Sequence, residues 1–104
     1  MQEPSYVYII VRKDLPGQHL LVQACHAAIA ATFSYGKHPT PHLVVCAVPN
    51  ERALESAFNR LKDAGVSCCS YTEPDLNGSL TSIATAPLKG AEQRKPLRRY
   101  QLLK

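Results

Sequence analysis

The chain has 104 residues, 45% of them hydrophobic, which is enough for one domain with its own core over residues 1–104 and too few for two. Twelve Lys and Arg against eight Asp and Glu give a formal net charge of +4, which suits an anionic partner. No apolar run approaches the roughly 20 residues of a membrane span, and no signal-peptide pattern is present. We therefore expect a cytoplasmic protein that does not bind membranes.

Residues 6–11 (YVYIIV) are β-branched or aromatic throughout, a pattern typical of a strand that is buried on both faces. Such a strand is expected in the interior of its sheet. Arg12, Lys13 and Asp14 end the strand, and a Pro-Gly pair then turns the chain into a helix. Asp14 should therefore lie at a strand end near a helix N-terminus, where sites form in open α/β sheets.

The helix predicted over residues 20–33 (LLVQACHAAIAATF) is almost wholly apolar, so we expect it to be buried. It carries one polar stripe. At about 100° per residue, His19, Gln23 and His26 fall within roughly 60° of one another. The stripe has two interpretations: a reactive site, or side chains that are simply hydrogen-bonded at a wet rim or a subunit contact.

Residues 42–48 (HLVVCAV) predict a second buried strand, and Asn50 is a suitable N-cap for an amphipathic helix that Gly65 closes. Residues 66–72 and 80–86 predict two more strands. The loop between them is long enough either for a hairpin or for a crossing over a neighbouring strand, and the sequence does not choose.

The last part of the chain is basic. Residues 90–99 predict a short helix, and residues 100–103 predict a final extended segment. The element order β-α-β-α-β-β predicts an α/β fold, in which helices flank a mixed sheet of about four strands.

The four cysteines fall within predicted buried elements, as reduced core thiols do, and disulfides are not expected: Cys25, Cys46, Cys68 and Cys69. We expect no cofactor and no metal site. His38 and His42 have a zinc-like spacing, but two prolines between them are incompatible with a helix and no Cys-x-x-Cys motif accompanies them.

Five features share a pattern with a known family: VRKDL at 11–15, QACHAA at 23–28, Glu-Pro at 73–74, IAT at 83–85, and a basic tail that ends in an aromatic residue and leucines at 100–104. Together they resemble the peptidyl-tRNA hydrolase type 2 family, and more closely its divergent branch of peptidyl-tRNA hydrolase domain-containing proteins. The resemblance covers nearly the whole chain. It implies an α/β fold, metal-free hydrolysis of the ester between peptide and tRNA, and a homodimer.

The resemblance also implies site residues. Asp14 matches the acidic residue of the family's strand-end motif, and Gln23 and His26 match its Q-x-x-H helix motif. The family's catalytic lysine would fall at His19 and is absent. The family's Asp and Thr after the third strand have no clean partners in the shorter loop at residues 73–79.

Ester hydrolysis needs a base for the attacking water and donors for the developing oxyanion. His19 and His26 are candidate bases, Glu73 and Asp75 are candidate carboxylates that orient the base, and Gln23 is a candidate donor to the carbonyl. Each residue also has a purely structural alternative, as a turn residue, a strand-end residue or a link between helix and sheet.

Seven basic residues are candidates for contact with tRNA or peptidyl-tRNA: Arg12, Lys13, Lys89, Arg94, Lys95, Arg98 and Arg99. Three functions follow from these patterns. The first is a peptidyl-tRNA hydrolase. The second is a catalytically degenerate module that binds tRNA or another anionic partner, and the third is a dimeric scaffold. The missing lysine favours the second, whereas the retained Gln23 and His26 favour the first.

Overall fold

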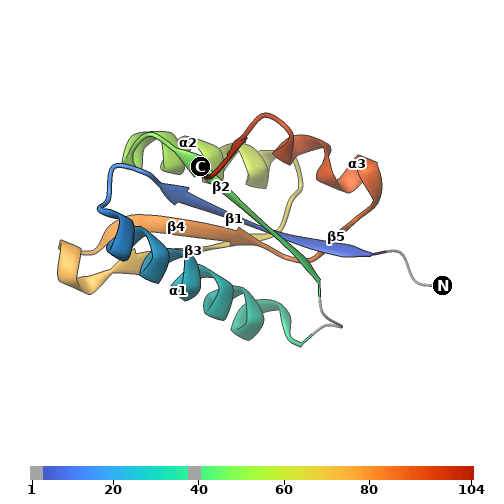
Figure 1. Cartoon of the computed structure of the whole chain (residues 1–104). Helices are drawn as coiled ribbons and strands as arrows, with labels where there is room; N and C mark the ends of the chain where they lie inside the picture. Colours follow the sequence, from blue (N-terminus) through green and yellow to red (C-terminus); the bar gives the residue numbers. More distant parts are fainter. Residues whose placement is uncertain (1–3, 38–40) are drawn as a thin grey trace.

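The computed structural model describes residues 4–37 and 41–104, which form an open mixed sheet with helices on both faces (Figure 1). The sheet has six strands in the order β3-β4-β1-β2-β6, with β5 paired to β1 off this path. The long strands are β1 Ser5–Arg12, β2 His42–Val48, β3 Cys68–Glu73 and β4 Ser79–Thr85. The short ones are β5 Leu88–Lys89 and β6 Gln101–Leu102. The predicted α/β fold and element order are confirmed, and the two short strands extend the four that were expected.

Strand β1 lies in the interior of the sheet, as its apolar run predicts. It pairs in parallel with β2 and antiparallel with β4 and β5. Alternate side chains enter two different cores: Tyr8 and Ile10 pack toward α2 (Glu51–Asp63), whereas Ile9 and Val11 pack toward α1 (Gly17–Tyr35). Burial on both faces is the reason that the strand shows no polar alternation.

Helix α2 forms as the sequence predicts. The Asn50 side chain accepts a hydrogen bond of 2.9 Å from the backbone N–H of Ala53, which caps the first turn. The helix buries Leu54 and Leu61, and Gly65 with φ 83° takes the left-handed conformation that ends it. Its outer face is charged, so α2 is an ordinary amphipathic helix.

Helix α1 lies on the opposite face of the sheet and packs chiefly on β1, β3 and β4 (Figure 1). The prediction that this helix is buried is wrong. It buries only Gln23, Ala27 and Ala31, while Leu21 is 66% exposed and Phe33 is 85% exposed. Both sides of the helix are apolar, so composition alone did not reveal which side the sheet covers. Across the two described ranges, no helix combines the length and the apolar character needed to cross a bilayer.

The four cysteines also differ in how deeply they are buried. Cys46 is buried and Cys68 and Cys69 are half-buried, but Cys25 lies exposed on the outer side of α1, so its predicted burial is wrong. All four are free thiols. Burial raises the pKa of Cys68 to about 11, which keeps this thiol protonated and unreactive at neutral pH.

The C-terminal segment folds back over the α2 face. The predicted helix at residues 90–99 is shorter than expected: α3 covers Gly90–Arg94, and a 3-10 turn follows at Lys95–Leu97. Pro96 within this turn has no backbone N–H to continue an α-helix. Leu97 is buried in the core and anchors the segment, and β6 then pairs with β2. The loop after β3 forms a hairpin to β4 through the 3-10 turn Pro74–Leu76.

Candidate active site

Gln23 is the one polar side chain that α1 buries, and both ends of its amide are hydrogen-bonded to the strands below. Its Nε2 donates to Glu73 Oε1 at 2.9 Å, and its Oε1 accepts from the Thr81 hydroxyl at 2.6 Å. The Ser82 hydroxyl donates to the backbone carbonyl of Gln23 at 2.8 Å. Because each end of the amide has a different partner, the orientation of the amide group is fixed.

A β-bulge explains how two consecutive residues of β4 reach the same glutamine. Tyr71 on β3 pairs with Ser82, but the next residue, Thr72, pairs with Leu80, so Thr81 is an extra residue on β4. Side chains normally alternate between the faces of a strand, and a bulge breaks that alternation. The bulge thereby directs the Thr81 hydroxyl to the Gln23 amide.

Glu73 ends β3 beside this amide. The hydrogen bond from Gln23 lowers the pKa of Glu73, and the nearby His26 acts in the same direction. Glu73 is therefore a carboxylate at neutral pH. A pKa below the usual value makes it a weak proton acceptor, so its chemistry is better suited to orienting and polarising a neighbour than to acting as the main base.

His26 lies one turn after Gln23 and stacks on Tyr71 of β3. The ring centroids are 4.4 Å apart and the planes differ by 9°. Partial burial raises the pKa of Tyr71, and the negative charges of Glu73 and Asp75 raise it further. The stack holds the imidazole by its face, which leaves the nitrogen atoms at its edge free to meet a substrate or a water molecule.

The remaining candidates of the polar stripe and loop lie at the margin of this cluster. His19 is exposed in the first turn of α1, one turn before Gln23. Asp75 is exposed in the 3-10 turn after β3, close enough for its charge to act on Tyr71. The structure thus brings Gln23, His26 and Glu73 together, with His19 and Asp75 beside them.

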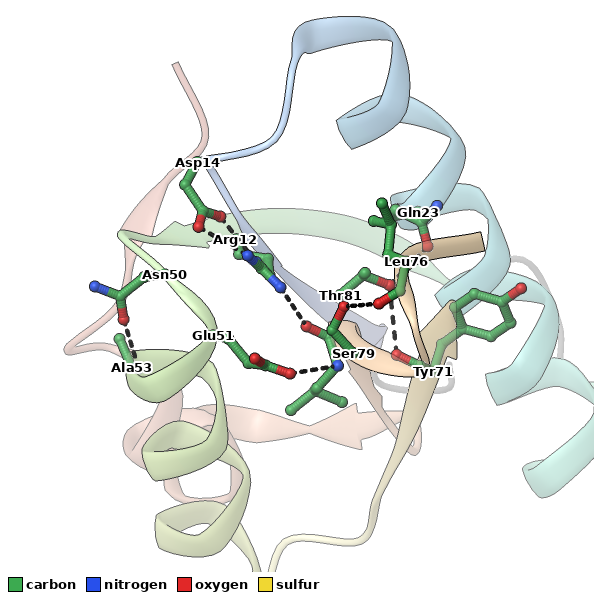
Figure 2. Close-up of polar contacts among 11 residues, drawn as sticks. Arg12, Asp14, Gln23, Asn50, Glu51, Ala53, Tyr71, Leu76, Ser79 and Thr81 are labelled. Carbon is green, nitrogen blue, oxygen red and sulfur yellow. Dashed lines mark hydrogen bonds and ion pairs between the residues drawn. The ribbon is translucent and has the colours of Figure 1, made fainter. Parts of the chain in front are cut away.

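Asp14 belongs to a neighbouring cluster and does not bond to Gln23. Arg12 donates to both of its carboxylate oxygens, at 2.8 and 2.9 Å, and a further N–H of Arg12 reaches the Leu80 carbonyl at 3.3 Å. Glu51 accepts from the Leu80 backbone N–H at 2.8 Å. Figure 2 shows this cluster on one side and Gln23 with Thr81 on the other. Arg12, which Asp14 orients, and Glu51 therefore hold the start of β4, next to the bulge.

The arrangement can support ester hydrolysis. A primary amide carries two N–H hydrogens, and Gln23 uses one of them for Glu73. The second is the candidate donor to an oxyanion, and the free edge of His26 is the candidate base. Among the described residues, no group of three or more His, Cys, Asp or Glu side chains could hold a metal ion.

Comparison with known proteins identifies the family. The sequence profile described as peptidyl-tRNA hydrolase PTH2 matches residues 5–103. The chain belongs to the PTH2 family. A human protein named "Putative peptidyl-tRNA hydrolase PTRHD1" is 29% identical over 114 residues, a stretch that covers 93% of this chain and 81% of the human one. A solved structure of a protein of unknown function from Agrobacterium tumefaciens C58 has the same fold, with a TM-score of 0.64, 14% identity and full coverage of both chains.

The basic residues of this PTH2 chain differ in their availability. Arg12 is paired with Asp14, and Arg94 stacks on Tyr6, so neither is a free surface cation. The other five candidates are exposed: Lys13, Lys89, Lys95, Arg98 and Arg99. Lys95 and Arg99 line a hollow of about 430 Å³ together with Arg60, a cation on α2 that the sequence patterns did not single out.

Three residues of the Gln23 cluster were also missed from the sequence: Tyr71, Thr81 and Ser82. The sequence does contain a signal for two of them. Thr81 and Ser82 are consecutive hydroxyl residues between Leu80 and Ile83, and both are fully buried. A buried hydroxyl needs a partner, so two in succession indicate a polar group that faces the strand.

Proposed function

We propose that this protein hydrolyses the ester that joins a peptide to tRNA, and that it acts in the cytoplasm during translation. The observation that carries the proposal is the fixed amide of Gln23, held between Thr81 and Glu73 with one N–H hydrogen to spare. A donor that is held in place before the substrate arrives needs no reorganisation as charge develops.

In the proposed reaction a water molecule attacks the ester carbonyl carbon. His26 takes a proton from that water, and Gln23 donates to the carbonyl oxygen as it becomes an oxyanion. The bond to the ribose oxygen then breaks, and the proton held by His26 passes to that leaving oxygen. Glu73 holds the Gln23 amide at the required angle through the 2.9 Å hydrogen bond. His19 is the alternative base.

The test is release of a labelled peptide from peptidyl-tRNA by the purified protein. Thr81→Val removes the hydroxyl that fixes the Gln23 carbonyl, and we expect it to lower kcat about tenfold or more, the scale of a lost positioning bond. Thr72→Val changes an exposed threonine of β3 in the same way and should leave kcat unchanged. Equal rates for the two variants, or no release by the parent protein, would contradict the proposal.

A second candidate function is a tRNA-binding module without hydrolysis. Two observations favour it: His19 stands where the family has its lysine, and three exposed cations line the hollow of about 430 Å³. The variant His19→Lys separates the candidates. A rise in peptide release identifies an enzyme limited by the lost positive charge, whereas binding of tRNA with no release from either protein identifies the module.

We also propose that two copies of the chain associate through α1. This helix, Gly17–Tyr35, has no Asp, Glu, Lys or Arg, and its outer side exposes Leu21, Val22, Ile29 and Phe33. Contiguous apolar surface of this kind marks an interaction site. Because the chain has a net charge of +4, two copies repel one another elsewhere, and an uncharged face is where they can meet.

The size and shape of the face suit a second copy. A helix of 19 residues is roughly 28 Å long. With the part of β2 that exposes Leu43 beside it, the strip covers on the order of 600 Å² per copy, near the roughly 800 Å² of a standard interface. A hollow of about 320 Å³ between α1 and β2, lined by Ala31 and Leu43 among others, can accept a large apolar side chain such as Phe33 of the partner subunit.

A further inference from the structure

A stack of aromatic and guanidinium groups lies at the end of β1 that is farthest from Gln23. The guanidinium carbon of Arg94 lies 3.5 Å from the centre of the Tyr6 ring. The His42 ring also stacks on Tyr6, with centroids 4.9 Å apart and planes inclined by 25°. A guanidinium at 3.5 Å fills one face of the tyrosine, so the imidazole occupies the other. The three groups form a continuous stack in the order Arg94, Tyr6, His42.

Three separate elements hold the stack in place. The register of the parallel pair sets Tyr6 of β1 beside His42 of β2. On the other side of β1, Leu88 of β5 pairs with Tyr6. Helix α3, which carries Arg94, follows β5 directly. The Nε–H of Arg94 donates to the hydroxyl of the buried Tyr8 at 3.0 Å. The stack is therefore ordered before any ligand arrives.

The His42 end of the stack is open. His42 is exposed, and β6 pairs with β2 at Cys46 and Ala47, with one further backbone hydrogen bond from Leu103 to Val45. Within residues 4–37 and 41–104, no strand other than β1 pairs with β2 at the level of His42. The exposed ring of His42 is therefore the place where one more flat aromatic group can add to the stack.

The charges around the stack select the kind of aromatic ligand. Arg94 is followed directly by Lys95, which lines the basic hollow with Arg60 and Arg99. No carboxylate forms part of the stack. A ligand that combines a flat aromatic ring with nearby negative charge matches this surface, and an unpaired nucleotide of RNA has both. An aromatic peptide side chain supplies the ring without the phosphate.

We propose that His42 forms a stacking site for an unpaired nucleobase, with the phosphates of the same strand in the hollow of Arg60, Lys95 and Arg99. From Tyr6 to Arg12 the strand β1 spans roughly 20 Å, so this site is separate from the cluster around Gln23. The inference goes beyond ester hydrolysis. It shares with the proposed function only the expectation that the ligand is RNA.

The test measures affinity for a fluorescent oligouridylate of about 12 nucleotides by anisotropy, with the full chain. We expect His42→Leu, which keeps the bulk but removes the flat ring, to weaken binding about 5-fold to 100-fold, the scale of one stacked base. His42→Phe keeps a ring and should bind within about twofold of the parent. The same strand annealed to oligoadenylate should bind the parent and His42→Leu equally, because its bases are already stacked.

A salt titration separates the contribution of stacking to the affinity from the contribution of charge. The slope of log Kd against log salt should be the same for His42→Leu and the parent, whereas Arg99→Glu should make it shallower. Equal oligouridylate affinity of His42→Leu and the parent, even if the melting temperature of the variant falls, would show that the stack only clamps the C-terminal segment and would overturn the proposal. Competition by tryptophan amide but not by uridine monophosphate would overturn it in favour of a peptide ligand.

These outcomes do not depend on catalysis, because oligouridylate contains no ester to a peptide. A protein that binds it through His42 but releases no peptide from peptidyl-tRNA would contradict the proposed hydrolysis alone. A protein that hydrolyses peptidyl-tRNA at the same rate with His42→Leu, and binds oligouridylate equally well with that change, would contradict the stacking site alone.

Discussion

The two faces of the sheet are covered by helices of opposite design. On one face, α2 buries leucines and exposes charge, and Asn50 caps it. On the other face, α1 buries the amide of Gln23 among alanines and exposes Leu21, Ile29 and Phe33. A helix that buries a glutamine and leaves its large apolar side chains exposed is poorly explained by stability alone. The difference is consistent with the two proposals for α1, a site on its inner side and a subunit contact on its outer side, whereas α2 serves the fold.

The largest effect should come from a matched pair of leucines, one on each helix. Leu54 of α2 is fully buried, whereas Leu21 of α1 is 66% exposed. Leu54→Ala should lower the free energy of unfolding by about 2–5 kcal/mol, because it removes contacts and leaves a cavity. Leu21→Ala should change it by less than about 0.5 kcal/mol in the monomer. Urea unfolding at low protein concentration measures both free energies, and an equal loss in the two variants would contradict the proposed difference between the helices.

The second effect should appear in catalysis. Gln23→Ala removes the proposed oxyanion donor and should lower the rate of peptide release on the order of a hundredfold or more. Gln18→Ala removes an exposed glutamine of the same helix and should have little effect. Circular dichroism checks that both variants fold. If Gln23→Ala folded and kept the parent rate, the inner side of α1 would be structural, like that of α2.

The outer side of α1 gives a third test. Phe33→Glu places a charge on the proposed contact between subunits, where it would have to enter the largely apolar hollow of the partner subunit. We expect the dissociation constant of the dimer to rise at least tenfold, as measured by sedimentation velocity. Phe58→Glu is unsuitable as a control because Phe58 packs against the core, so Asn59→Glu on the exposed side of α2 serves instead. Equal shifts in both variants would contradict the contact.

The smallest effect concerns the ion pair at the start of β4. The hydrogen bond from Arg12, with its positive charge, lowers the pKa of Asp14. A carboxyl group with a lowered folded pKa adds stability above its unfolded pKa, near 3.9, and this contribution disappears as the pH falls through the folded value. Asp14→Asn should therefore lower stability at pH 7 by less than about 1 kcal/mol, because the pair is partly exposed. The melting temperatures of parent and variant should become equal in strong acid. A difference in melting temperature that persists there would point to a cause other than charge.

The sequence predicted those parts of the molecule in which local pattern and burial agree. The run at residues 6–11 is buried on both faces, and Asn50 and Gly65 bound α2 as their cap chemistry requires. The exposure of α1 was not predictable, because its inner and outer sides are both apolar and only the packing distinguishes them. Pro96 explains the shorter C-terminal helix, because it has no backbone N–H to continue an α-helix.

The candidate site was predictable along one helix but not between elements. The spacing of Gln23 and His26 placed them on one side of α1, and both do contact β3, Gln23 through Glu73 and His26 through Tyr71. The contribution of Thr81 depends on a bulge, which is a property of two paired strands and has no local signal in β4. The pairing of Asp14 with Arg12 is local. The sequence alone did not decide whether Asp14 contacts Arg12 or the Gln23 cluster, and the structure shows that it contacts Arg12.

The most direct test of the account is the pH dependence of peptide release. A histidine acts as a base only in its neutral form, so hydrolysis through His26 predicts a kcat/KM that rises with pH and then levels off. His26→Ala should lower the plateau on the order of a hundredfold and abolish the rise, while the protein stays folded. A flat profile between pH 5 and about 8, together with a His26→Ala variant as active as the parent, would contradict the claim that the polar stripe of α1 is a catalytic site.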